Sequence, residues 1–161
     1  GGDAGLLEEV RPLLETMGKN ILHVGAVGQG KVVKIVNQAL AAIHLLAMSE
    51  AFALGVKSGA DPGVLYDVIK SSSGYSKMMD LRLPGFLFEN SFRPGFRLDL
   101  MKKDLNLAVD SAQALGLPMA FTALAAQVFA AASISGRGDE DFAAAAGFLA
   151  GLAGATLEPR K

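Results

Sequence analysis

A mostly helical fold around one long central helix is what the sequence predicts, and three observations support it. Between Gly28 and Glu50 the chain is dominated by Val, Ile, Leu and Ala, with no Pro or Gly after its opening glycines, which is typical of a long helix buried on most sides. Apolar residues downstream recur at helical spacing, with capping residues and Pro-Gly breaks between the runs. With 161 residues, 51% of them apolar, the chain can form one ordinary core.

The first 25 residues predict one helix followed by one strand. Asp3 is placed to cap a helix whose apolar stripe stops at Gly18. Residues 20–24 then alternate in polarity and end at Gly25, as a short strand does. A strand with no partner leaves its backbone groups unpaired, so we expect its neighbours to lie upstream. Residues 1–27 are therefore predicted to be the end of a truncated domain, and the chain to be a fragment.

The rest of the chain, residues 28–155, predicts one all-helical domain. Gly55 and Gly59 mark the end of the long helix, and Asp61 with Pro62 starts the next one. We expect the following elements: a helix to about Ile69, a loop over 71–74, two short pieces over 76–90 broken at Pro84-Gly85, a turn over 93–95, and helices over 98–115, 118–133 and 141–152. A loose tail is expected over 156–161.

Composition excludes several classes of function. The net charge of −1 argues against nucleic acid as a partner, and the absence of cysteine excludes disulfides and thiolate sites. His23 and His44 are isolated, so no metal site is predicted. Polar residues interrupt the long apolar run, which argues against a membrane span: Lys34, Asn37, His44 and Glu50. No secretory signal is visible, so we expect a cytoplasmic protein.

A polar patch near the start of the long helix is the first candidate for chemistry. Lys34, Asn37 and Gln38 follow the spacing i, i+3, i+4 and share one helix face. One explanation is a helix end that emerges from the core, with its Lys reaching water. The other is a catalytic Lys with an amide beside it that orients a ligand.

Two motifs together resemble the β-hydroxyacid dehydrogenases, the family that includes 3-hydroxyisobutyrate dehydrogenase and tartronate semialdehyde reductase. The first is GxGxxxKxxNQ over residues 28–38, and the second is FxLxLMxKDLNLA over residues 96–108. Shorter matches extend the resemblance over the whole chain, from GGD at the start to DF at Phe142. Each motif alone is weak, but the two in this order and at this separation are fairly specific.

The resemblance implies a two-domain enzyme: an N-terminal Rossmann-type dinucleotide-binding domain, a long interdomain helix and an all-helical C-terminal domain. The family's Gly-rich phosphate loop and its Ser-Gly-Gly substrate clamp have no match in this chain, so the chain alone is expected to be inactive. Lys34 matches the catalytic Lys, and Asn37 the Asn beside it. Phe96 and Asp104 match residues that border the substrate pocket, and Lys103 matches a Lys that reaches the cofactor, NAD or NADP.

The residue types fit hydride transfer. Negative charge builds on the carbonyl oxygen during reduction, and a positioned ammonium can stabilise that charge and donate a proton. Lys34 is expected to be this acid, with partial burial among Val33, Ile35 and Val36 lowering its pKa. Asn37 can offer a donor and an acceptor to a small hydroxy acid.

Each other candidate has an ordinary alternative. Lys103 can pair with Asp99, four residues earlier on an exposed helix face. A lone Phe96 is more often core, and a lone Asp104 more often a solvated charge. The alternative for the whole chain is a non-catalytic helical dimerisation module, because the Ala-rich helices over 121–132 and 142–153 leave little polar surface. In either case a homo-oligomer through the helical domain is expected.

Overall fold

The computed structural model describes residues 1–160, which form two compact units: Gly1–Asn37, and a second unit that begins at Gln38. The boundary between the units falls inside a continuous helix, α2 (Gln29–Lys57). The domain boundary after residue 27 stays a prediction from the sequence. The described residues are mostly helical and contain one isolated β-bridge, between Arg97 and Asp141.

The first unit contains α1 (Ala4–Glu15), which Asp3 caps as expected: its Oδ1 accepts the Leu6 N–H at 2.9 Å. The strand predicted over residues 20–24 is wrong, since this segment has no regular structure. Its neighbour is the start of the chain: the Gly2 N–H donates to the Gly25 carbonyl at 2.8 Å, and His23 Nε2 lies 2.7 Å from the Gly2 carbonyl oxygen. These few contacts do not form a ladder, so a helix-strand unit is not present.

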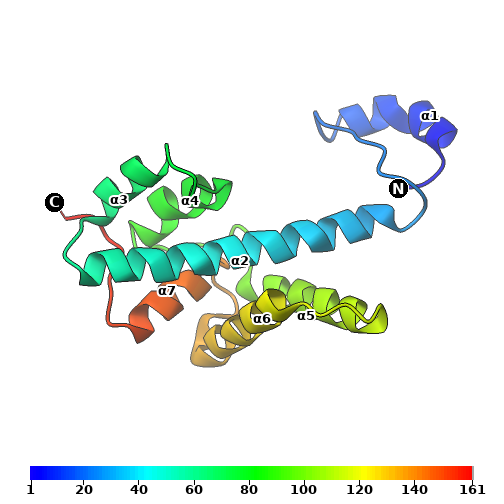
Figure 1. Ribbon diagram of the computed structural model, residues 1–161. Coiled ribbons are helices and arrows are strands. Elements are labelled where there is room, and N and C mark those ends of the chain that lie inside the picture. The colour runs from blue at the N-terminus through cyan, green and yellow to red at the C-terminus, as the bar shows by residue number, and fades with distance from the viewer. Residues whose placement is uncertain (161) are drawn as a thin grey trace. The chain divides into compact units, whose positions relative to one another are not determined.

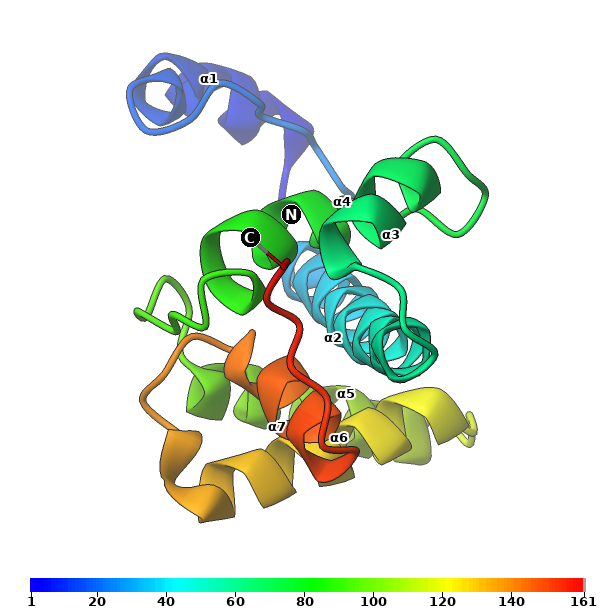
Figure 2. The same cartoon turned by 90° about the vertical axis from the view of Figure 1, so that its left-hand side faces the viewer.

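Helix α2 is the predicted long helix, but it is buried over only part of its length. Its buried residues begin at Ala39 and continue to Ala53, while Val32, Val33 and Val36 are each about half exposed. The expectation that it is buried on most sides is therefore wrong for its first ten residues. From Gln38 onward α2 lies between α3–α4 on one side and α5–α7 on the other, as Figure 1 and Figure 2 show.

Length and composition alone would allow α2 to cross a bilayer despite the polar residues along it, but 44% of its most apolar window is buried inside the fold. A core helix of a water-soluble fold has the same properties.

Helix α3 (Pro62–Ile69) has the predicted bounds, and Asp61 accepts the N–H groups of Gly63 and Val64. The region over 76–90 forms two pieces, as expected. Helix α4 (Lys77–Arg82) ends where Arg82 departs from helical geometry, and a wider π-helical turn η1 (Leu83–Leu87) contains Pro84 and Gly85.

The other three helices are α5 (Leu98–Ala114), α6 (Ala120–Ala132) and α7 (Ala144–Leu152), with a π-helical turn η2 (Ser133–Arg137) after α6. Gly116 ends α5 with a positive φ of 67°, which confirms the stop signal read from the sequence. Helix α7 begins three residues later than predicted, because Asp141 and Phe142 are engaged with the segment before α5.

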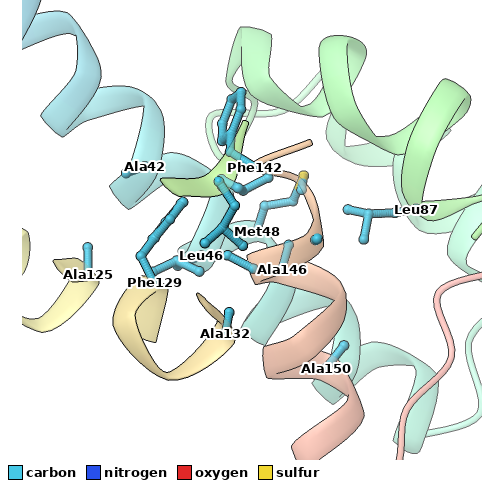
Figure 3. Close-up of a cluster of buried hydrophobic side chains, with 14 of the residues drawn as sticks. Ala42, Leu46, Met48, Leu87, Ala125, Phe129, Ala132, Phe142, Ala146 and Ala150 are labelled. Atoms are coloured by element: carbon cyan, nitrogen blue, oxygen red, sulfur yellow. The ribbon is translucent and has the colours of Figure 1, made fainter. Parts of the chain in front are cut away.

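The core is apolar and closely packed, with side chains from α2, α6, η1 and α7 directed into one cluster (Figure 3). Phe129 and Ala143–Ala146 are completely buried. Alanine lets α7 approach α2 closely enough for Ser49 Oγ to donate to the Ala146 carbonyl at 2.6 Å. The alanines at the start of α7 are therefore buried inside the fold, contrary to the expectation that they face a partner.

The tail was predicted to be loose over 156–161; within its described residues, 156–160, two contacts hold it to the fold, and residue 161 lies outside the described residues. Leu157 is 4% exposed, and the Arg160 N–H donates to Asp61 Oδ2 at 2.8 Å. The tail thereby ties the end of the chain to the start of α3 (Figure 2).

Tail packing predicts an unequal response to two leucine truncations. Leu157→Ala should lower the free energy of unfolding by about 2–5 kcal/mol, because it empties a buried site. Leu152→Ala is the matched control, since Leu152 is 70% exposed, and should change it by less than about 0.5 kcal/mol. Urea denaturation measures both. Equal small effects would mean that the tail does not contribute to the core.

A carboxylate at the start of α4 ties the loop over 71–76 to α3. Asp80 accepts hydrogen bonds from the hydroxyls of Tyr75 and Tyr66, both at 2.7 Å, and Lys70 lies 3.7 Å away. Donation by Tyr75, then by Tyr66, holds the pKa of Asp80 below its usual range.

The pH dependence of stability follows from that direction. Because the folded pKa of Asp80 is lowered, its contribution is complete above the unfolded pKa of about 4 and is lost as pH falls through the folded value. Asp80→Asn should therefore destabilise the protein at neutral pH, and the difference from wild type should shrink below about pH 4. Urea midpoints across this range measure it. Asp67→Asn, an exposed carboxylate on α3, is the control. A pH-independent difference would contradict the prediction.

Candidate functional site

The five residues predicted to form a site fall on two segments of the chain. Lys34 and Asn37 lie one turn apart in the exposed part of α2, within the first unit. Phe96 precedes α5, and Lys103 and Asp104 lie within it, all in the second unit. Lys34 is exposed, and Val33 and Val36 beside it are 51% and 54% exposed. The predicted partial burial of Lys34 among its helix neighbours is therefore not found.

Asp104 is a buried acid and not the solvated charge that its sequence alone suggests. Its residue is 2% exposed, and Oδ2 accepts a hydrogen bond from Gln38 Nε2 at 3.2 Å. A carboxylate in this position needs charged or donating partners, because burial of an unpaired charge is costly. Gln38, which the sequence analysis named as part of the polar patch, thus joins α2 to Asp104.

Lys103 does not make the surface pair that its spacing suggests. Asp99 is instead 2.8 Å from Lys102 and accepts from Ser133 Oγ at 2.6 Å. The hydrogen bond from Lys102, followed by that from Ser133, holds the pKa of Asp99 below its usual range. The side chain of Lys103 is 59% exposed, with Nζ 3.6 Å from Asp104 Oδ1. The ammonium of Lys103 is therefore presented to solvent beside a buried carboxylate.

Phe96 is half-buried and packs edge-on against Phe142, with ring centroids 6.1 Å apart and planes at 82°. Its backbone is held at both polar groups. The Phe96 N–H donates to Asp141 Oδ2 at 3.0 Å, and the Phe96 carbonyl accepts from the Phe142 N–H at 2.9 Å. The sequence analysis treated Asp141 only as the start of a helix; an acid before a helix is a cap signal, and its long-range partners left no local pattern.

Asp141 is completely buried, and an ion pair with Arg82 explains how the negative charge of its carboxylate is accommodated. Arg82 Nε lies 3.2 Å from Asp141 Oδ1, but its N–H is not aimed at that oxygen, so the contact is an ion pair and not a hydrogen bond. The guanidinium stacks between Phe86 and Phe142, with Cζ 4.8 and 4.4 Å from the two ring centroids. The Arg82–Asp141 ion pair is therefore next to Phe142, the ring against which Phe96 packs.

Comparison with known proteins identifies a family and several relatives that this chain resembles. Residues 28–149 match the family model described as "NAD-binding of NADP-dependent 3-hydroxyisobutyrate dehydrogenase". The chain is 38% identical over 144 residues to 2-(hydroxymethyl)glutarate dehydrogenase of Eubacterium barkeri, covering 89% of this chain and 48% of that protein. It is 42% identical over 135 residues to 3-hydroxyisobutyrate dehydrogenase of Pseudomonas aeruginosa, covering 80% and 45%.

A solved structure agrees with the sequence relatives. The 3-hydroxyisobutyrate dehydrogenase of Mycobacterium tuberculosis, in a structure with L-serine, superposes with a TM-score of 0.85 at 35% identity, covering 92% of this chain and 53% of that one. The chain spans about half the length of the relatives it matches. The family match over most of the chain, together with the shared helical fold, shows that this chain belongs to the β-hydroxyacid dehydrogenase family.

Proposed function

We propose that this chain is the helical C-terminal part of an NAD(P)-dependent oxidoreductase that interconverts a small 3-hydroxy acid and its semialdehyde. The match over residues 28–149 to a family described as NAD-binding carries the proposal. The named relatives and the bound L-serine support the substrate class, since each named compound is a carboxylic acid with a hydroxymethyl group on the carbon next to the carboxylate. The cytoplasmic location stays a prediction from the sequence.

Lys34 is the proposed general acid and base. In reduction a nicotinamide cofactor would supply the hydride to the carbonyl carbon, and Lys34 Nζ would donate a proton to the carbonyl oxygen. In oxidation the neutral amine of Lys34 takes the hydroxyl proton, and the oxidised nicotinamide cofactor would accept the hydride from the same carbon. Asn37 follows Lys34 by one helical turn and contributes a neutral donor and acceptor for the substrate. The half-exposed valines beside Lys34 offer an apolar surface for a dinucleotide-binding domain to cover.

The α5 residues are assigned to substrate and cofactor. Asp104, held by Gln38, and the half-buried ring of Phe96 are proposed to border the substrate pocket. Lys103 presents an exposed ammonium, which fits the phosphate or ribose oxygens of a dinucleotide better than a buried amine would. The choice between NAD and NADP follows from an acidic or basic residue in the dinucleotide-binding domain.

The first test is removal of the proposed acid in the full-length enzyme. Lys34→Ala should lower turnover by about a hundredfold or more, because it removes the proton donor. Lys34→Arg should not restore it, since a guanidinium keeps its proton at working pH. Steady-state assays with 3-hydroxyisobutyrate, 2-(hydroxymethyl)glutarate and L-serine, each with NAD and NADP, measure both.

Lys31→Ala is the matched control, because Lys31 is exposed on the same helix three residues earlier. It should keep normal turnover. If Lys34→Ala turns over as fast as Lys31→Ala, Lys34 has no part in the chemistry.

A second candidate function is dimerisation through α6. Phe121 and Leu124 are 76% and 65% exposed, and they border an apolar hollow whose other walls come from α2 and α7. A second copy of the chain is the proposed occupant, since small alanines along α6 allow another helix to approach closely. This surface is compatible with the enzyme function, because α6 contributes none of the proposed catalytic residues.

Charge placed on this surface should separate the copies. Leu124→Glu should convert dimers to monomers at micromolar concentration, because it buries an unpaired carboxylate in the contact. Leu54→Glu is the control, since Leu54 is 71% exposed on α2. Sedimentation velocity measures both, and removal of residues 1–25 should leave the dimer intact. A wild-type chain that sediments as a monomer would eliminate the α6 contact.

A further inference from the structure

We propose that Asp141 is a positioning residue for the substrate pocket: its buried carboxylate fixes the backbone at Gly95 and Phe96 and thereby sets where the Phe96 ring stands. The inference rests on the proposed role of Phe96 in bordering that pocket. Asp141 lies 45 residues further along the chain than Phe96 and does not itself need to touch substrate.

One oxygen of the Asp141 carboxylate, Oδ2, accepts hydrogen bonds from the segment before α5. Asp141 Oδ2 accepts the N–H of Gly95 at 3.1 Å and that of Phe96 at 3.0 Å. This segment is a bend outside any helix, so no helical ladder holds it in place. The returning bond from the Phe142 N–H to the Phe96 carbonyl, at 2.9 Å, fixes the other side of the same residue. Residues 141 and 142 therefore hold the backbone of Phe96 at both of its polar groups, beside a further bond from the Leu98 N–H to the Glu140 carbonyl at 2.8 Å.

The second oxygen anchors the carboxylate itself. Asp141 Oδ1 accepts the Ala143 N–H at 2.9 Å and faces Arg82 Nε at 3.2 Å. Arg82 in turn lies over the ring of Phe142, which packs edge-on against Phe96. The ring of Phe96 is thus located by its backbone and by its aromatic neighbour, and both of these depend on Asp141.

Asparagine cannot reproduce this arrangement although it has the same shape. The groups around the Asp141 oxygens are backbone N–H donors and the Arg82 cation, whereas an amide has one accepting oxygen, one donating NH₂ and no charge. In Asp141→Asn the NH₂ group must face either the N–H pair of Gly95 and Phe96 or the Ala143 N–H and the Arg82 guanidinium. In the first orientation the Gly95 and Phe96 N–H groups lose their acceptor. In the second, the side chain loses its anchor at Ala143 and Arg82 and holds Phe96 less firmly.

A double-mutant cycle in the full-length enzyme tests whether Asp141 acts through Phe96. Asp141→Asn should raise KM for the hydroxy acid by about tenfold and change kcat by less than about threefold, since a displaced pocket wall loses ground-state binding. Phe96→Ala should also raise KM. In the Phe96→Ala background Asp141→Asn should have no further effect, because the group that it positions is gone.

Asp139→Asn is the matched control. Its side chain is 89% exposed and pairs with Arg97 at 2.8 Å, so it removes a carboxylate next to the same segment without touching Phe96. It should leave KM unchanged. Gly95→Ala is a second variant that keeps every charge and remains available if Asp141→Asn fails to fold. Its added Cβ would lie 3.2 Å from Asp141 Oδ2, and it should raise KM in the same sense by a smaller factor.

A readout independent of turnover separates this inference from the proposed function. Phe96 is replaced by 4-fluorophenylalanine, and its ¹⁹F resonance is recorded with Asp141 intact and with Asp141→Asn. The resonance should shift or broaden with Asp141→Asn and stay unchanged with Asp139→Asn. If the resonance does not respond, Asp141 does not position Phe96 and the inference is overturned.

The kinetic outcomes are equally decisive. An equal rise in KM from Asp141→Asn in both backgrounds would mean that Asp141 acts on the fold and not through Phe96, and would overturn the inference. A ¹⁹F response in an enzyme that turns over no 3-hydroxy acid would contradict the proposed function while leaving the positioning of Phe96 by Asp141 established.

Discussion

The burial of the Asp141 carboxylate is the constraint on which the second unit depends. A completely buried carboxylate is tolerated only where donors or positive charge face its oxygens. Here these partners come from separate parts of the chain: the cation of Arg82 at the end of α4, the N–H groups of the bend at Gly95 and Phe96, and the N–H of Ala143 just before α7. The acid therefore joins three segments that no helix connects. Loss of one partner from such a buried pair costs about 3–5 kcal/mol, more than any single helix cap contributes.

A second buried acid extends this logic along α5. The helix begins just after the bend that Asp141 holds, and it carries Asp104, which is bonded to Gln38 of α2. In its first two turns, before Asp104, α5 buries apolar side chains such as Leu98 and Met101. Hydrophobic packing is non-directional, whereas each acid requires particular donors. The two acids therefore add directional contacts to the apolar packing of α5.

Much of the fold could be predicted from local signals. Asp61 with Pro62 and Gly116 mark helix ends through contacts within a few residues, and the structure places helix ends where they indicated. The prediction of a strand over residues 20–24 was wrong because alternating polarity indicates only that a strand is possible. A strand also needs a neighbouring strand to pair its backbone hydrogen bonds. The packed tail was missed because Leu157 and Arg160 find their partners far back in the chain.

The sequence by itself determined the helices, their order and the family, because helix ends, periodicity and motifs are each encoded within about one or two turns of chain. Only the tertiary structure decided which charges are buried and which partners they take. Asp99 pairs with Lys102 and Ser133 and not with Lys103, and Gln38 and Asp104 meet across 66 residues. The physical reason is that burial and partner choice depend on which helices pack together, and the free energy of that packing is summed over many distant contacts that no short stretch of sequence contains.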